Sequence, residues 1–419
     1  MADPPPLPTG SGARALFGQR DYRHFWVARF MDLLAVQIQA VTIAWQVYAL
    51  ARHQGYDVGE SALAVGMIGL AQFIPLFFLS LISGATADRH DRKLIMAICI
   101  AVEIVSAAAL ALLSWSERIE LWHIFALAVV FGSARAFFSP ASTAMAPMLV
   151  PRHLLPNAIA WGSLNWQTAS ILGPAVGGLL CAVSTALSYG VTTALYVGSI
   201  AVLFLLRGVT RPATQPGSRL ALIREGLAYV WRQKIVFGAI SLDLFAVLLG
   251  GATALLPVFA RDVLHVGPEG FGALRAAPAV GATAVALALA VKPIRQRAGL
   301  MMFGGVAVFG VATIVFALSK IMIVSLAALA VLGGADMISV YVRQTLVQLV
   351  TPDPMRGRVA AVSTLFIGAS NELGEFESGV VARFLGPVGA ALFGGIGALV
   401  VTGVWARLFP DLRKADELA

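Results

Sequence analysis

The chain has 419 residues, of which 58% are hydrophobic and only 12% are charged, and its mean hydropathy is +0.83. Because about 25% of the residues in an average soluble domain are charged, this composition excludes a soluble globular protein and a disordered one. The net charge of +8 comes from basic residues spread over many short loops, which is typical of a protein face next to anionic lipid rather than of a nucleic-acid site. We therefore predict an all-α protein that crosses a membrane many times.

Twelve apolar runs along the chain are each long enough to cross a bilayer, which takes about 20 residues. The predicted spans are 25–50, 61–87, 94–113, 120–147, 156–183, 185–206, 235–262, 269–291, 299–318, 321–350, 357–384 and 386–408. The predicted domains are an N-terminal tail (1–24), a six-helix bundle (25–206), a central loop (207–234), a second six-helix bundle (235–408) and a C-terminal tail (409–419). The central loop contains a predicted amphipathic helix, Leu220–Lys234.

The orientation follows from the distribution of Lys and Arg. Of the 30 such residues, 21 lie in the tails, the central loop and alternate short loops, 5 lie in the opposite loops and 4 lie within spans. Because cytoplasmic loops carry the excess of positive charge, we expect both termini and the central loop in the cytoplasm of a bacterial inner membrane. The first 24 residues lack the apolar core of a cleaved signal peptide.

The sequence carries no signature of catalysis or of a bound cofactor. No lysine follows a glycine, so a phosphate-binding Gly-Lys motif and ATP-driven pumping are not predicted. No two histidines are spaced as a His-x-x-x-His zinc site, and Cys99 and Cys181 both lie inside apolar runs. We therefore predict no enzyme activity, no metal and no cofactor.

The two halves resemble each other. At an offset of 211 residues Asp32 aligns with Asp243, and at an offset of 201 Gly173 aligns with Gly374. Two parallel copies of one six-helix unit are the architecture of a large class of secondary transporters, which hold the substrate between the halves. The alternative is a chance match of alanine-rich helices.

The loop between the second and third spans contains Gly84, Asp88, Arg89, Arg92 and Lys93 in the pattern Gly-x-x-x-Asp-Arg-x-x-Arg-Lys. This pattern resembles the signature of the major facilitator superfamily at every defined position. The resemblance implies a fold of two parallel six-helix bundles and a role for this loop as a conformational latch that does not bind substrate. The alternative is an ordinary basic loop.

The fifth span contains Gly173-Pro174-x-x-Gly177-Gly178, which is similar to the end of a motif found in antiporters of that superfamily. Small residues let helices approach closely, and proline bends a helix. The resemblance favours export over import.

The segments 351–358 and 371–375 and the overall layout resemble the enterobactin-exporter branch of the superfamily over residues 20–408. The resemblance implies proton-driven efflux of a siderophore, drug or other amphiphile by a monomer whose partners are protons and membrane lipids. An importer of a sugar or organic acid is the alternative within transport. A receptor or scaffold without transport activity is a more remote one.

Charged residues inside apolar spans cost about 2.5–3.5 kcal/mol each when unpaired. In the resembling family spans 1, 4, 7 and 10 line the substrate cavity. The charged residues on these spans, our predicted cavity residues, are Arg29, Asp32, Arg135, Asp243, Asp336 and Arg343. Arg29 and Asp32 share a helix face, and Arg135 and Asp336 occupy equivalent repeat positions, so we expect the latter two to face each other. The alternative is that all six form structural ion pairs.

The eleventh span carries Glu372, Glu375 and Glu377 within six residues. Like charges this close in a span oppose joint ionisation, so we predict that Glu375, supported by Glu372, carries protons. A packing cluster satisfied by hydroxyls or arginines is the alternative. Glu103 and Arg275 lie on spans outside the predicted cavity, and we expect both to have packing roles.

Overall fold

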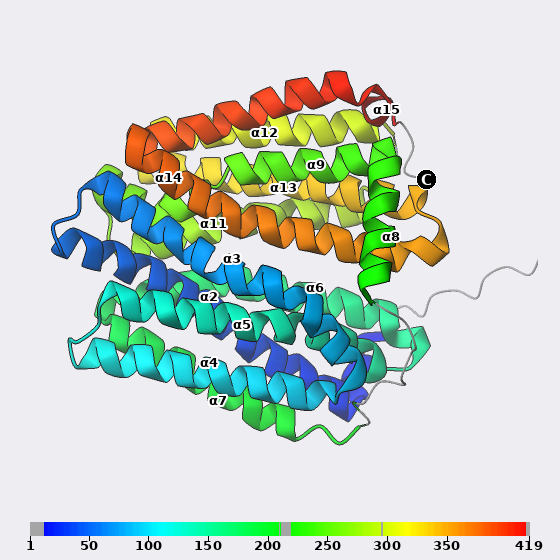
Figure 1. Ribbon diagram of the computed structural model, residues 1–419, viewed down its shortest axis with the longest axis horizontal. Helices are drawn as coiled ribbons and strands as arrows, with labels where there is room; N and C mark the ends of the chain where they lie inside the picture. Colours follow the sequence, from blue (N-terminus) through cyan, green and yellow to red (C-terminus); the bar gives the residue numbers. More distant parts are fainter. Residues whose placement is uncertain (1–11, 209, 211–218, 295, 416–419) are drawn as a thin grey trace, which may run out of the picture.

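The computed structural model of the protein describes residues 12–208, 210, 219–294 and 296–415. These residues form α-helices joined by short turns and contain no strand (Figure 1). Most of the helices run side by side along the long axis of the molecule in two groups.

The first bundle follows a short helix, α1 (Gly12–Gly18). Its six long helices are α2 (Arg20–His53), α3 (Val58–Arg89), α4 (Arg92–Trp115), α5 (Leu121–Met145), α6 (Leu155–Val183) and α7 (Thr185–Phe204). Short polar residues begin three of these helices by accepting hydrogen bonds from backbone amides of the first turn: Asp57 before α3, Asp91 before α4 and Ser184 before α7. The turns between the helices are therefore short and well defined.

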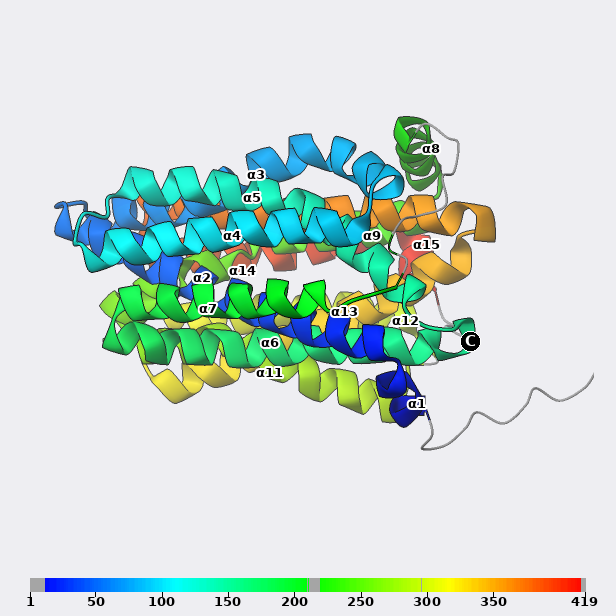
Figure 2. The ribbon, with the colours of Figure 1, turned by 90° about the horizontal axis from the view of Figure 1, so that it is seen from below.

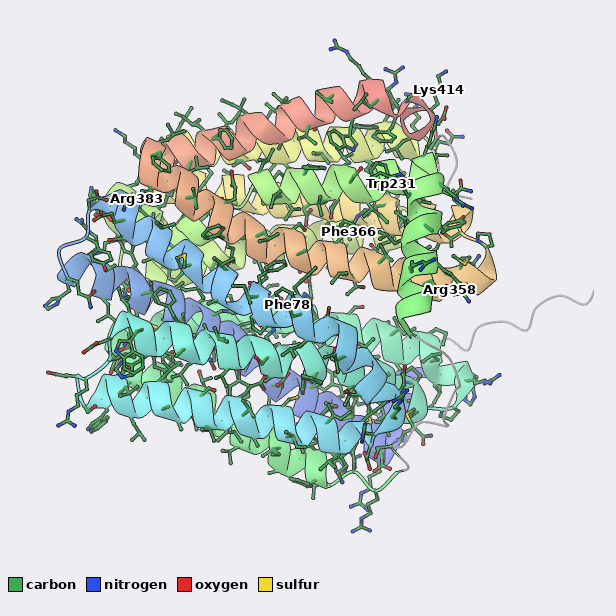
Figure 3. All side chains as sticks on the ribbon, viewed as in Figure 1. Phe78, Trp231, Arg358, Phe366, Arg383 and Lys414 are labelled. Carbon is green, nitrogen blue, oxygen red and sulfur yellow. The ribbon has the colours of Figure 1, made fainter. Side chains whose placement is uncertain are left out.

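Helix α8 (Arg219–Arg232), the predicted amphipathic helix of the central loop, runs across the ends of the second bundle (Figure 1). Val230 is buried in an apolar cluster with Val236 and Val359 of the neighbouring spans, and the Tyr229 hydroxyl donates to the carbonyl of Val350 at 3.1 Å. Glu225 forms an ion pair with Arg358, which Figure 3 shows beside α8.

The second bundle contains α9 (Lys234–Leu249), α11 (Pro268–Val291), α12 (Ala298–Leu318), α13 (Met322–Val350) and α14 (Asp353–Leu408). Three short elements extend the first of these spans beyond Leu249: the 3-10 turn η3 (Ala252–Leu255), α10 (Leu256–Val258) and the π-helical turn η4 (Phe259–Val263). A last short helix, α15 (Pro410–Arg413), packs against α9 and α12.

Helix α14 is two spans. Its 56 residues would measure about 84 Å if straight, whereas a bilayer core is about 30 Å thick. Gly386 adopts a φ of 72°, which lies outside the helical region and is readily adopted by glycine. The chain turns back at this residue, just before Pro387 (Figure 1). The eleven apolar helices of the described residues thus give twelve spans, which confirms the predicted fold of two six-helix bundles.

Within the part of the chain that the structure describes, the two bundles share a core at one end only. One apolar cluster joins residues of both bundles, such as Tyr48 and Ile68 in the first and Phe259 and Phe271 in the second. The remaining clusters each lie within one bundle. We call the shared region the closed end; α1, α8 and α15 lie at the opposite, terminal end (Figure 2).

A charged cavity between the bundles as the candidate functional site

A cavity of about 530 Å³ lies between the bundles, with walls contributed by both of them. Its volume falls in the range of roughly 300–1,000 Å³ that is usual for small-molecule sites. Its polar wall residues are Gln37, Gln39, Gln72, Arg135, Gln167, Ser170, Thr253, Arg275, Asp336, Asn371, Glu372 and Glu375. Apolar side chains, among them Phe131, Trp166 and Phe309, fill the spaces between these groups.

An ion pair crosses the cavity from one bundle to the other. Nη1 of Arg135 on α5 lies 3.6 Å from Oε1 of Glu372 on α14, and the same nitrogen lies 3.5 Å from Oε1 of Gln72. The guanidinium also lies over the ring of Phe131, 5.8 Å from its centre. The arginine is thus held in position by its own bundle and binds a carboxylate of the other.

A second ion pair lies on the wall of the second bundle. Nη2 of Arg275 on α11 lies 3.7 Å from Oε1 of Glu375, and its Nη1 donates to the carbonyl of Thr253 at 3.4 Å. We expected a packing role for Arg275, but the structure places this residue on the cavity wall. An arginine about two turns into an apolar helix was the available signal, and it indicated a carboxylate partner.

Small residues on α3 bring the two glutamates to the cavity. A Cβ atom on Gly69 would lie 2.6 Å from the carbonyl oxygen of Glu372, and one on Gly66 would lie 2.8 Å from that of Glu375. The α14 backbone therefore touches α3 directly, and both carboxylates lie on the cavity wall beside this contact. Glu377 is not among the wall residues and its carboxylate faces the Ser378 hydroxyl at 3.5 Å.

Asp336 lines the cavity as expected from the repeat, but it is not the ion-pair partner of Arg135, which binds Glu372 instead. Asp336 also borders a small side chamber of the second bundle together with Asp243 and Ser339. Internal symmetry shows which positions are equivalent but not which side chains meet across the axis.

The other four predicted cavity residues lie behind the wall of the main cavity in this conformation. Arg29 and Asp32 form the expected ion pair along one face of α2, at 3.7 Å. Arg343 on α13 binds Asp243 on α9 at 3.2 Å, and both side chains are less than a tenth exposed. Pairing explains their position, because an ion pair tolerates burial that a lone charge does not.

Polar contacts between the bundles reinforce the closed end. The Tyr48 hydroxyl of the first bundle donates to Asp262 of the second, whose other carboxylate oxygen lies 4.0 Å from Arg52. Glu60 at the start of α3 pairs with Arg383 of α14 at 3.0 Å; Figure 3 shows Arg383 at this end of the molecule. These contacts hold the bundles together beyond the cavity.

The Gly-Pro motif of α6 lies at a contact between helices. Gly173 and Gly177 pack against α2 of the same bundle. Gly178 faces α11 of the other bundle, where a Cβ on Gly272 would lie 2.4 Å from the carbonyl oxygen of Pro174. The motif therefore lies where α6 packs against α11 of the other bundle, at the closed end.

The loop motif between α3 and α4 is tied to its own bundle. Lys93 donates to the carbonyl of the last residue of α7 at 3.2 Å and to that of Leu206 just beyond it at 2.7 Å, and Arg92 donates to a carbonyl of α5 at 2.7 Å. The Asp88 carboxylate lies 4.0 Å from Arg92, Gly84 is buried and Arg89 is exposed. The basic residues thus cap helix C-termini, where a positive charge is favourable.

Comparison with known proteins agrees with this architecture. The chain is 25% identical over 394 residues to the enterobactin exporter EntS of Citrobacter koseri, with 94% of this chain and 92% of that protein covered, and equally similar to EntS of Escherichia coli O1:K1 / APEC. A D-xylose–proton symporter structure superposes with a TM-score of 0.72 at 11% identity, covering 93% of this chain and 98% of the symporter. A structure of the nucleoside transporter NupG gives a TM-score of 0.67 at 14% identity, covering 93% of this chain and 99% of that one.

A family described as transmembrane secretion effector matches residues 11–419, which is nearly the whole chain. The chain therefore belongs to the transmembrane secretion effector family of major facilitator superfamily transporters.

Proposed function

We propose that this transporter is a proton-coupled exporter of a siderophore, drug or similar amphiphile. The observation that carries the proposal is the pair of Arg–Glu contacts on the cavity wall, one across the bundles and one within the second bundle. The similarity to enterobactin exporters over most of the chain supports the substrate class.

The cavity suits an amphiphile that presents hydrogen-bond donors. Amide side chains such as Gln37, Gln167 and Asn371 share its wall with the apolar surfaces of Trp166 and Phe309. A ligand with an apolar ring system and a few peripheral donors would satisfy both kinds of surface.

The ion pairs suggest how the charge of the substrate decides whether substrate and proton move in opposite directions or in the same direction. A cationic or donor-rich substrate would bind the carboxylates of Glu372 and Glu375 and would therefore compete with protons for the same oxygens. Competition at one site produces exchange, in which a proton enters as a substrate leaves. An anionic substrate would instead bind Arg135 or Arg275 and free a carboxylate for protonation, so that anion and proton would move together.

We assign the main proton-carrying role to Glu375 and a supporting one to Glu372. Neutralising Glu375 would release Arg275 without breaking an ion pair between the bundles, because both residues belong to the second bundle. Neutralising Glu372 would remove an attraction between the bundles, because its partner Arg135 belongs to the other one. Proton binding at the two positions would then affect both substrate affinity and bundle movement.

The proposed orientation follows from the excess of Lys and Arg at the terminal end. With this end in the cytoplasm of a bacterial inner membrane, the closed end faces outward and the cavity is set to receive substrate from the cytoplasm. The loop motif around Asp88 would stabilise the alternative state as a latch.

The test begins with a strain that lacks the protein, from which secretion of siderophores and sensitivity to a panel of drugs are measured. Purified protein in liposomes is then given enterobactin and a cationic dye as probes. An exporter of this kind accumulates a probe inside vesicles with an acidic lumen, and an ionophore that collapses the pH gradient abolishes the accumulation. Uptake that instead requires an acidic outside would show a proton-coupled importer and overturn the proposal.

A further inference from the structure

A pair of buried acids lies apart from the cavity glutamates. Asp32 on α2 and Glu103 on α4 are 2% and 1% exposed, and their carboxyl groups are within hydrogen-bonding contact of each other. Two carboxylate ions cannot hydrogen bond, because neither has a proton to donate. The contact therefore requires a proton on one of the two groups.

The surrounding charges do not balance two ionised acids. The titratable and charged groups that face the pair are Arg29 on α2, Cys99 on α4, Arg135 on α5 and Tyr196 on α7. Of the two arginines, Arg29 binds Asp32 at 3.7 Å and Arg135 binds Glu372 of the other bundle. One arginine thus remains for two acids, so ionisation of both acids would leave one uncompensated charge at this depth, which is strongly unfavourable.

The unmet hydrogen-bond acceptors of the pair also indicate a proton on one of the two carboxyl groups. Oδ1 of Asp32 and Oε2 of Glu103 have no donor among the described residues, and both atoms are buried. Unmet acceptors of this kind are rare in folded proteins and call for an explanation. A proton on either carboxyl group turns one acceptor into a donor for the other.

We propose that Asp32 and Glu103 form a proton-binding site inside the first bundle, distinct from Glu372 and Glu375, which holds one proton between the two carboxyl groups in the conformation described here. The proposal departs from our expectation of a packing role for Glu103. It adds a site on a helix that contributes no residue to the cavity wall.

Arg135 connects this site to the cavity. Its charge acts on both Asp32 and Glu103, while its guanidinium lies in the cavity wall and binds Glu372. A movement that draws α14 away from α5 would remove Glu372 and leave the buried pair as the nearest acids. Arg135 would then compensate the second carboxylate, and the shared proton would leave to cavity water while Arg135 stays protonated.

The test measures the proton itself. Infrared spectra of the purified protein in lipid nanodiscs are recorded at neutral pH, where a protonated carboxyl group gives a carbonyl band that a carboxylate lacks. Glu103→Gln should remove one component of this band, because Asp32 would then be left with Arg29 and ionise. Asp32→Asn should change the position or the area of the same component, and the matched control Glu117→Gln, in an exposed turn, should leave it unchanged.

Glutamine is an isostere of a protonated glutamate, so the proposal also requires Glu103→Gln to fold with nearly the melting temperature of the unmodified protein. Failure of this variant to fold would overturn the proposal, and so would a carbonyl band identical in both variants and the unmodified protein. The measurement needs no substrate and no gradient. The proton-binding site can therefore fail this test while proton-coupled export stands, and the reverse also holds.

Discussion

Gly178 on α6 and Gly272 on α11 touch across the boundary between the bundles, where a Cβ atom on Gly178 would lie 2.9 Å from the Cα atom of Gly272. The same relationship recurs between α3 and α14, where a Cβ atom on Gly66 would lie 2.9 Å from the Cα atom of Gly379. Backbones approach this closely in membranes only where both residues are small. The closed end therefore has no room for a side chain at either contact.

The first prediction follows from this packing. Gly178→Val places a side chain against the carbonyl oxygen of Pro268, which a Cβ atom alone would approach to 2.5 Å. Overpacking of this kind costs about 1–3 kcal/mol, and the protein avoids that cost by separating the bundles here. We expect a shift of about tenfold or more toward the state that is open at this end.

Spin labels on Ser116 and His265, which lie in exposed turns of different bundles, report the separation. The interspin distance should increase in Gly178→Val. Gly190→Val on α7 is the control, because nothing lies within 4 Å of a Cβ atom there. Equal distances in all three proteins would show that the glycine contact does not determine the closed state.

The second prediction concerns the polar contacts between the bundles at the closed end. Asp262→Asn removes the charge that Arg52 and the Tyr48 hydroxyl share. Loss of a charge-assisted hydrogen bond weakens an interface by about 1.5–3 kcal/mol when buried, and by less here because Asp262 is about a quarter exposed. We expect a smaller increase in the same interspin distance than Gly178→Val produces, and no increase in Glu117→Gln.

The sequence was sufficient to predict the architecture. The predicted span 269–291 corresponds to α11, and the break expected between 384 and 386 coincides with the turn at Gly386. Span lengths are set by bilayer thickness and breaks by glycine, proline and charge, all of which can be read locally. The break in the seventh span after Leu249 was not foreseen, because apolar residues continue on both sides of Gly250 and Gly251 and the two glycines were included in the span.

The site was less predictable, for a physical reason. Which residues face the cavity depends on how each helix is rotated about its axis, and apolar helices with few polar residues carry little information about that rotation. Arg275 was therefore placed outside the cavity, and Asp243 was expected to line it rather than to lie buried against Arg343.

The third prediction tests the ion pair that crosses the cavity. Arg135→Gln and Glu372→Gln each leave one uncompensated charge, so each should lower the free energy of unfolding by about 1–3 kcal/mol. The double variant should lose much less than the sum, since neither charge is left alone. Denaturation in detergent measures the three values, and strict additivity would show that the two residues do not interact.

The last prediction separates the proton carrier from its neighbours on α14. Glu375→Gln keeps the size of the side chain and removes its charge, so Arg275 loses its carboxylate partner and the cavity loses the group proposed to exchange protons. Gradient-driven accumulation of a probe in acid-loaded vesicles should fall to the level of empty vesicles. Exchange of labelled for unlabelled probe, which needs no net proton movement, should continue. Glu377→Gln is the matched control, two residues away on the same helix and absent from the cavity wall, and it should retain both activities. Normal accumulation by Glu375→Gln would move the proton role to Glu372 or Asp336, the remaining acids of the wall.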